Sequence, residues 1–308
     1  MKGYFNVKEI IKIGSNIYNL SVGREVRRMI IFMVRAFFKR QQMHELIEFF
    51  SETRFKDELA KTNPFFYEQV TRQFFYKDST FQSRNAMIKQ HVSYIVSTLD
   101  AEAIKQIYTP KGWRLWSEKY KEQELSLIAW FHGGQKKEGM LSLVLKLDDE
   151  DIYQIIFWIA PAMDSNETAI WIGAMQGTNH PNALETIKEL TKYFHGYRTK
   201  NLILYMVRCF AKAMGIQKIY AVSNEGFYAN NHIRINRKLK TSLNDFWLES
   251  AGKESKDSRF YELPVEEYRK SMEEVKTHKR NLYRKRFEKM DAIEREIDES
   301  IHNFLKSN

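Results

Sequence analysis

The chain has 308 residues, of which 43% are hydrophobic and 29% charged, so it can bury the core of one large or two modest domains. A single cysteine, Cys209, excludes an intrachain disulfide framework and most thiolate metal sites, which favours a reducing compartment. The net charge of +10 favours anionic partners, but it does not distinguish nucleic acid, anionic lipid and phosphate-bearing small molecules.

The N-terminal region carries no secretory signal that we can identify. Lys8, Glu9 and Lys12 stand where a signal peptide needs an apolar run. The apolar run at residues 29–34 is far shorter than the roughly 20 residues that span a bilayer. We therefore predict a cytoplasmic protein, either free or held at the inner face of the inner membrane.

Residues 24–50 have the periodicity of an amphipathic helix. An apolar side and a basic side lie nearly opposite each other: Val26, Ile30, Met33 and Phe37 against Arg24, Arg28, Arg35 and Lys39. Such a helix packs its apolar side on the domain with the basic side in water, or it lies on an anionic membrane. We favour the first interpretation and keep the second open.

Irregular helical periodicity continues to residue 100, and the turn residues at 108–112 mark a boundary. We predict an N-terminal helical region at residues 1–115 and a mixed α/β domain at residues 116–308. Beyond Tyr120 the periodicity becomes strand-like, with four candidate strands at residues 125–131, 140–147, 152–160 and 167–175. Their connections are short, which predicts an antiparallel meander.

A helical crossover follows the fourth strand. One helix begins at Asn182 and stops at Gly196, a second helix ends before Gly215, and a strand follows at residues 219–222. A strand, crossover, strand unit makes two parallel strands that end at the same edge of a sheet. The turns at residues 176–180 and 223–226 would then meet in a ligand-binding cleft, unless both are ordinary surface connections.

The C-terminal region predicts a short strand at residues 259–263 and then a long helix from Glu266 onward. A basic block in this helix precedes an apolar stripe: Lys276, Lys279, Arg280, Arg284, Lys285, Arg286 and Lys289, then Met290, Ile293, Ile297, Ile301 and Phe304. No motif for reading DNA or RNA surrounds the block, so we predict no specific nucleic acid partner. The predicted fold class is α+β, with a mixed, mainly antiparallel sheet between N-terminal helices and a long C-terminal helix.

The common catalytic motifs are absent from the sequence. It has no phosphate loop, dinucleotide fingerprint, nucleophile elbow or His-Glu-x-x-His motif, and we predict no metal site. His180 and Glu185 fit the His-x4-acid spacing of some lipid acyltransferases, but Glu185 also occupies a capping position. We therefore retain His180, which lies in the expected cleft, without its acidic partner. Arg198 and Lys200 begin a helix, where they bind phosphates or remain solvated charges.

Several segments together resemble the VirK/YbjX family of Gram-negative bacteria across residues 120–295. The matching segments are Met-Gln-Gly at 175–177, His-Gly-Tyr-Arg-Thr-Lys at 195–200, Ala-Val-Ser-Asn at 221–224, Asp-Phe-Trp-Leu-Glu at 245–249, Phe-Tyr-Glu-Leu-Pro at 260–264 and Lys-Arg-Asn-Leu-Tyr-Arg-Lys-Arg at 279–286. The family's usual His-Gly-Leu-Arg-Pro-Lys departs here at Tyr197 and Thr199, and its Gly-Gly pair is Ala251 and Gly252. The resemblance implies a role in virulence, in outer-membrane and lipid A remodelling, or in resistance to cationic antimicrobial peptides.

The predicted architecture is similar to the layout of GCN5-related acyltransferases, where two parallel strands separate to admit the pantetheine arm of an acyl donor. This chain lacks their Gln/Arg-x-x-Gly-x-Gly/Ala pyrophosphate turn and has two crossover helices where one is usual. The first hypothesis is an acyltransferase that uses acyl-coenzyme A or an acyl carrier protein. The residues assigned to it are His180 as the base with Ser223 and Asn224, and Gln176, Gly177, Arg198 and Lys200 for the donor.

The second hypothesis is a non-enzymatic peripheral protein. In that case the helix at residues 24–50 and the basic tail attach the chain to anionic lipid or to an envelope partner. The two hypotheses differ at the cleft, because room between the two turns predicts a ligand and a filled space does not.

Overall fold

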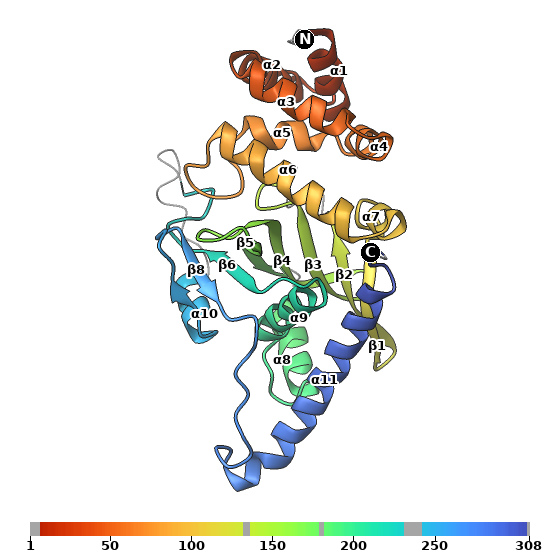
Figure 1. Ribbon diagram of the computed structural model, residues 1–308. Helices are drawn as coiled ribbons and strands as arrows, with labels where there is room; N and C mark the ends of the chain where they lie inside the picture. The colour runs from red at the N-terminus through yellow and green to blue at the C-terminus, as the bar shows by residue number, and fades with distance from the viewer. Residues whose placement is uncertain (1–6, 132–135, 179–181, 231–241, 307–308) are drawn as a thin grey trace.

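The structure is a computed structural model that describes residues 7–131, 136–178, 182–230 and 242–306. Its fold is α+β, as predicted, with a mixed sheet between N-terminal helices and a long C-terminal helix (Figure 1). The helices before the sheet are α1 Val7–Ile17, α2 Gly23–Phe38, α3 Arg40–Ser51, α4 Arg54–Thr62, α5 Phe65–Thr71, α6 Phe81–Thr98 and α7 Ala101–Ile107.

Residues 24–50 form two helices, so the prediction of one continuous helix was wrong. The helical path is interrupted at Lys39, whose φ is −115° and ψ is 35°. This break allows both helices to bury residues in one core: Phe32 and Ala36 from α2, and Met43 and Leu46 from α3. The sequence period is helical on both sides of Lys39, so it gives no sign of the change in direction.

The sheet has eight strands in the described part of the chain, in the order β1-β2-β3-β4-β5-β6-β8-β7. Their bounds are β1 Trp113–Tyr120, β2 Gln123–Trp130, β3 Leu141–Leu147, β4 Glu150–Pro161, β5 Thr168–Gly177, β6 Lys218–Val222, β7 Lys253–Glu254 and β8 Phe260–Leu263. The predicted meander is confirmed as β2 to β5, and the predicted last short strand is β8. Only the pair β5 and β6 is parallel among these strands, so the sheet is mixed and mainly antiparallel.

Neither β1 nor β7 was predicted to be a strand. β1 is an edge strand with charged residues at Arg114, Glu118 and Lys119, which obscure the alternation of buried Trp113 and Leu115. Such charges are common on sheet edges, where they discourage pairing with other chains. β7 has only two residues, too few for a periodic signal.

Helices cover both faces of the sheet (Figure 1). α6 lies against β4 on one face, and α9 lies against β3 and β4 on the other, with α11 beside α9 and β1. Buried apolar residues of the N-terminal helices, the sheet and α11 form one continuous core. The division into regions at residues 115 and 116 stays a prediction, and the core crosses that position.

The crossover contains two helices, α8 Ala183–Tyr193 and α9 Thr199–Ala213, as predicted. Gly196 has a φ of +77°, and its backbone N–H donates to the carbonyl oxygen of Thr191 at 2.8 Å, which ends α8. Gly215 ends α9 in the same left-handed region, with a φ of +71°. These two stops set the lengths of both helices and return the chain to β6.

Replacing Gly196 by alanine is expected to lower the free energy of unfolding by about 1 kcal/mol, because an alanine strains the left-handed backbone at this position. Urea denaturation measures the change. Gly23→Ala is the matched control, since a Cβ atom there meets no atom within 4 Å. A Gly196→Ala variant as stable as wild type would show that the turn relaxes at no cost.

The long C-terminal helix α11 spans Arg280–His302 and follows the short helix Thr277–Lys279. The predicted helical start at Glu266 was wrong, because residues 266–276, between β8 and the short helix, are irregular. Glu267 there binds Arg208 and Tyr197 of the crossover, and these contacts hold the segment out of a helix. The apolar stripe of Met290, Ile293, Ile297 and Ile301 is buried, as its period indicated.

Candidate functional site at the ends of strands β5 and β6

β5 and β6 are parallel neighbours, paired from Ala169 with Lys218 to Ile172 with Ala221. Their ends lie at the same edge of the sheet, as predicted. β5 then continues through residues 173–177, where it pairs only with β4 in the described part of the chain. We call this region, between residues 173–177 of β5 and the turn after β6, the fork.

A β-bulge marks the start of the fork. Ile156 of β4 lies opposite Ala174 and Phe157 lies opposite Ile172, so Gly173 is the extra residue. A Cβ atom on Gly173 would lie 1.9 Å from the backbone carbonyl oxygen of Glu138. Only glycine permits this approach, so the segment at residues 136–139 lies directly against the fork.

Side-chain hydrogen bonds hold this segment in place. The amide Nε2 of Gln69, a fully buried residue of α5, donates to the carbonyl oxygen of Lys136 at 2.7 Å and to that of Gly139 at 2.9 Å. The two bonds clamp the chain on either side of Glu138. The position of Glu138 beside the bulge is therefore fixed by the fold.

The carboxyl group of Glu138 is buried, with only 8% of the residue exposed. Tyr228 and the backbone N–H groups of Lys137 and Glu138 favour its charged form, whereas its Oε2 has no hydrogen-bond partner among the described residues. Burial raises the pKa of Glu138 to about 7, against the smaller lowering effects of Lys137 and Tyr228. A carboxyl with this pKa exchanges protons near neutral pH, which is the property of a general acid or base.

An aromatic side chain fills the base of the fork. The backbone N–H of Ser223 donates to Arg259 beside β8, so by strand alternation the carbonyl of Val222 points toward β5. The indole Nε1 of Trp247, which is fully buried, donates to that carbonyl at 2.9 Å. The hollow expected between the two turns is thus occupied at its base. The part of the fork beyond Trp247 is the edge of β5.

The edge of β5 carries two of the predicted donor-binding residues, Gln176 and Gly177. Gln176 is exposed, and Gly177 is half-buried. The backbone N–H of Thr178 donates to Ile152 of β4, so the backbone groups of Met175 and Gly177 face away from β4, toward the fork. An extended ligand can pair with a strand edge of this kind.

The predicted catalytic residues Ser223 and Asn224 make hydrogen bonds within the protein. Ser223 Oγ donates to the carbonyl oxygen of Ser258 and accepts from the backbone N–H of Gly226, both at 3.0 Å. Asn224 Oδ1 accepts from the backbone N–H of Leu243 at 2.8 Å, at the start of α10 Leu243–Glu249. These bonds shape the turn after β6, and a catalytic role for either residue stays a prediction.

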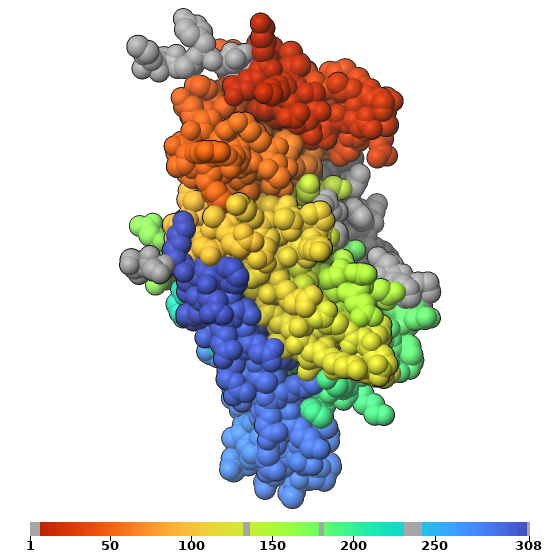
Figure 2. Space-filling model, turned by 90° about the vertical axis from the view of Figure 1, so that its right-hand side faces the viewer, coloured from red at the N-terminus to blue at the C-terminus, as the bar shows by residue number. Residues whose placement is uncertain are grey.

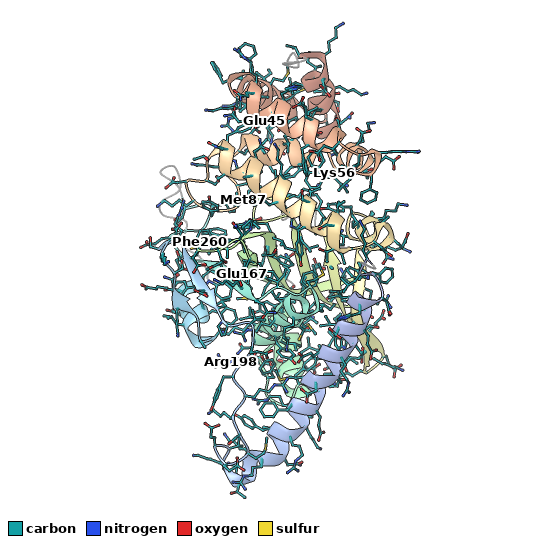
Figure 3. All side chains as sticks on the ribbon, in the orientation of Figure 1. Glu45, Lys56, Met87, Glu167, Arg198 and Phe260 are labelled. Atoms are coloured by element: carbon teal, nitrogen blue, oxygen red, sulfur yellow. The ribbon has the colours of Figure 1, made fainter. Side chains whose placement is uncertain are left out.

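Arg198 and Lys200 share one carboxylate at the start of α9. Both bind Oε2 of Glu249 in α10, Arg198 at 3.3 Å and Lys200 at 3.1 Å, and the Lys200 ammonium also lies 4.7 Å from the centre of the Phe246 ring. Figure 3 places Arg198 on the side of the sheet that α9 covers. Two cations against one anion leave a net positive charge beside the N-terminus of α9, where the helix dipole favours phosphate.

The predicted base His180 lies at residues 179–181, outside the described residues. Its role stays a prediction. Of the predicted site, the structure therefore brings Ser223 and Asn224 to the turn after β6, Gln176 and Gly177 to the edge of β5, and the two cations to α9.

Residues 21–299 match the sequence model of the family described as "Protein of unknown function (DUF535)". The chain belongs to the DUF535 family. A stretch of 270 residues is 24% identical to an uncharacterized protein of Haemophilus influenzae and covers 88% of each chain. A stretch of 127 residues is 35% identical to the uncharacterized protein YbjX of Escherichia coli K12, covering 41% of this chain and 38% of YbjX. These matches confirm the VirK/YbjX resemblance.

Two structural findings apply to the described part of this DUF535 protein. None of its helices is both long enough and apolar enough to cross a bilayer. None of its groups of His, Cys, Asp and Glu side chains is arranged to hold a metal ion.

Glu138 is the residue of this DUF535 protein that sequence reasoning missed. In the sequence it ends the run Lys136-Lys137-Glu138, which is typical of a solvated turn. The only local signal was Gly139, where a Cβ atom would lie 2.5 Å from the carbonyl oxygen of Phe157. A glycine beside a charged run can indicate close backbone packing, but it does not name the partner.

Proposed function

We propose that this protein is an acyltransferase-like enzyme that binds its acyl donor, an acyl-coenzyme A or an acyl carrier protein, at the fork. The observation that carries the proposal is that β5 extends past the last residue paired with its parallel neighbour β6, through residues 173–177. A bulge at Gly173 begins this edge, which pairs with β4 but with no second strand in the described part of the chain, and a buried carboxyl group lies against it.

The strand arrangement supports this choice of reaction class. An antiparallel meander, one helical crossover and a single parallel pair are similar to the layout of GCN5-related acyltransferases. In those enzymes the pantetheine arm of the donor enters where the two parallel strands separate. The amide groups of a pantetheine arm would pair here with the backbone of Met175 and Gly177, as a short added strand would.

Glu138 is the group we assign to proton transfer. The hydroxyl or amine of the acceptor attacks the thioester carbonyl carbon, the carbon–sulfur bond breaks, and the proton of the acceptor passes through the Glu138 carboxylate to the departing thiolate. A pKa of about 7 leaves a substantial share of Glu138 ionised at neutral pH, which this step requires. His180 remains the alternative base, and the acceptor we propose from the family resemblance is an envelope constituent such as lipid A.

Phosphate binding is assigned to Arg198 and Lys200. Both cations are held by Glu249, and a donor phosphate would replace that carboxylate as their anion. This arrangement stands in for the pyrophosphate turn that the sequence lacks. Trp247 limits how deep the donor reaches, because its indole closes the fork at Val222.

Isothermal titration with a panel of acyl-coenzyme A and acyl carrier protein donors tests the proposal. We expect binding of at least one donor and about a tenfold weaker affinity in Arg198→Ala, the effect of one lost charged hydrogen bond. Arg54→Ala is the matched control, because Arg54 is also an exposed arginine paired with a glutamate, Glu58. Absence of heat with every donor, or an Arg198→Ala variant that binds like Arg54→Ala, would exclude the assigned site.

A further inference from the structure

Helices α1 and α2 expose an apolar surface at one end of the molecule, the red end in Figure 2. Seven residues make up this surface, which we call the apolar end: Val7, Ile11, Ile30, Ile31, Val34, Phe37 and Phe38. Phe38 is 77% exposed and Ile30 is 56% exposed. Scattered exposed apolar residues are ordinary, but a contiguous group on two packed helices marks an interaction surface.

The apolar end is separate from the part of α2 that packs on the protein. α2 buries Met29, Phe32 and Ala36, whereas Ile30 and Phe37 point outward. The favoured interpretation, in which Ile30 and Phe37 pack on the domain, was therefore wrong. α2 therefore exposes a second apolar side in addition to the one that packs on the core.

Two of the basic residues that were expected to face water, Arg28 and Arg35, instead contact helix α5. Arg35 donates to the carbonyl oxygen of Thr71 in α5 at 3.0 Å, and the Arg28 guanidinium lies 3.9 Å from the carboxylate of Glu68 in the same helix. These contacts explain why the helix is rotated relative to the expectation. They place arginine stems against α5 and release apolar positions to the surface.

A groove joins the two helices across the apolar end. Among the described residues it is lined by apolar side chains: Val7, Ile10, Met33, Val34, Phe37 and Phe38. Few polar groups are present there to orient a small polar ligand. The groove and its rim therefore offer an apolar contact surface without polar anchor points. Such a surface suits an apolar partner that has no fixed shape.

The charge around the apolar end is strongly positive. Residues 7–40 contain eight Lys or Arg and two Glu, and one of the two, Glu25, is bound by Arg28. Arg24 and Arg27 are exposed at the start of α2, and Lys39 and Arg40 are exposed just past its end. A partner that covers this surface thus meets apolar residues flanked at both ends by cations.

We propose that the apolar end docks on an anionic lipid membrane. Val34 and Phe38 enter the boundary of the acyl chains, while Arg24 and Arg27 contact the lipid phosphates. Apolar side chains next to Lys and Arg are the signature of a helix lying in the membrane interface. A lipid surface also adapts to the shape of the protein, so it can cover the groove and its rim without a complementary surface of its own.

This inference is independent of the acyl donor at the fork. It concerns α1 and α2, at the opposite side of α6 from the sheet in Figure 1. Membrane binding is measured without an acyl donor. The failure of one proposal therefore does not affect the other. A membrane-docked enzyme and a non-enzymatic peripheral protein both use the same surface.

Co-sedimentation of the full chain with vesicles tests the proposal. One set contains phosphatidylglycerol and phosphatidylethanolamine, and the other contains phosphatidylcholine alone. We expect binding to the anionic set, weakened by added salt because salt screens the arginine–phosphate attraction. Equal binding to both sets, or binding to neither, would overturn the proposal.

Two variants separate the apolar and the charged contributions. Val34→Ser combined with Phe38→Ser is expected to lower the partition coefficient on anionic vesicles at least about tenfold, through lost apolar burial. Arg24→Gln combined with Arg27→Gln is expected to lower it about tenfold and to reduce its salt dependence. Thermal melting verifies that these exposed substitutions leave the fold intact.

Leu184→Ser is the matched control, because Leu184 in α8 is 77% exposed, as Phe38 is. We expect its vesicle binding to equal that of wild type. Sedimentation equilibrium covers the other possible occupant, a second copy of the chain. A wild-type dimer that the Val34 and Phe38 substitutions dissociate, with vesicle binding unchanged, would overturn the proposal.

Discussion

Replacing Arg208 by alanine is expected to lower the free energy of unfolding by about 3–5 kcal/mol, the usual cost of breaking a buried charge pair. Arg208 lies in α9, and only 3% of it is exposed. Its guanidinium donates to the carbonyl oxygens of Pro264 at 3.0 Å and Ser250 at 2.9 Å, and to Glu267 Oε2 at 2.9 Å. One side chain thus joins the ends of β8 and α10 to the segment before α11.

The large expected cost arises from what the substitution leaves behind. Glu267 loses its cationic partner while its side chain stays only 22% exposed, and two backbone carbonyls lose their donor. The hydroxyl of Tyr197 still donates to Glu267 at 2.6 Å, but it supplies no charge. Arg208→Lys keeps the positive charge but loses the planar set of guanidinium N–H donors, so we expect a smaller loss of about 1–2 kcal/mol.

Urea denaturation of both variants checks this prediction. Arg198→Ala, just before the same helix, is the control, because that side chain is 63% exposed and its pair with Glu249 is worth at most about 1 kcal/mol. An Arg208→Ala variant within about 1 kcal/mol of wild type would show that water satisfies the groups that Arg208 binds.

Local sequence signals predicted the parts of the fold that depend on local chemistry. Gly196 and Gly215 ended the two crossover helices because left-handed backbone favours glycine. Alternation and short connections predicted β2 to β5, and the crossover predicted that β6 is parallel to β5. These signals placed the two strand ends at one edge before any contact was known.

Contacts between distant segments decided what the sequence could not predict. Trp247 reaches the carbonyl of Val222 at the fork because α10 packs against β8, the neighbour of β6, and its place in a short Asp-Phe-Trp run did not reveal this. The rotation of α2 depends on Arg35 reaching Thr71, 36 residues away. Glu138 likewise owes its buried position to Gly173 of β5, which has no side chain and so allows the backbone of Glu138 to approach.

Replacing Glu138 by glutamine is expected to raise the free energy of unfolding by about 3 kcal/mol at pH 8, because wild type must keep a charged carboxylate buried there. The pKa of Glu138 rises from 4.5 to about 7 on folding. At about 1.4 kcal/mol per pH unit, the shift amounts to about 3 kcal/mol. The residue is 8% exposed, so solvent screens little of this effect.

The sign follows from the number of bound protons. Between pH 4.5 and about 7 the folded wild type holds the Glu138 proton and the unfolded chain releases it. Rising pH therefore lowers the stability of wild type through this window, and the loss is complete above the folded pKa. The glutamine variant has no such proton, so its advantage over wild type should grow from pH 4.5 to 7 and then level off.

Urea denaturation across this pH range measures the difference between the two proteins, which removes the contributions of all other groups. Glu122→Gln is the control, because its side chain is 93% exposed, and we expect it to change stability by less than about 0.5 kcal/mol. A Glu138→Gln variant that is less stable than wild type at pH 8 would show that the carboxylate is stabilised in the fold.

The same variant links stability to the proposed reaction. A group that destabilises the fold at neutral pH yet is clamped in place through Gln69 is expected to serve function, because a structural role alone would favour glutamine. We therefore expect Glu138→Gln to bind the acyl donor as wild type does and to release its thiol at least about a hundredfold more slowly. A variant that is both more stable and equally fast would remove Glu138 from the reaction.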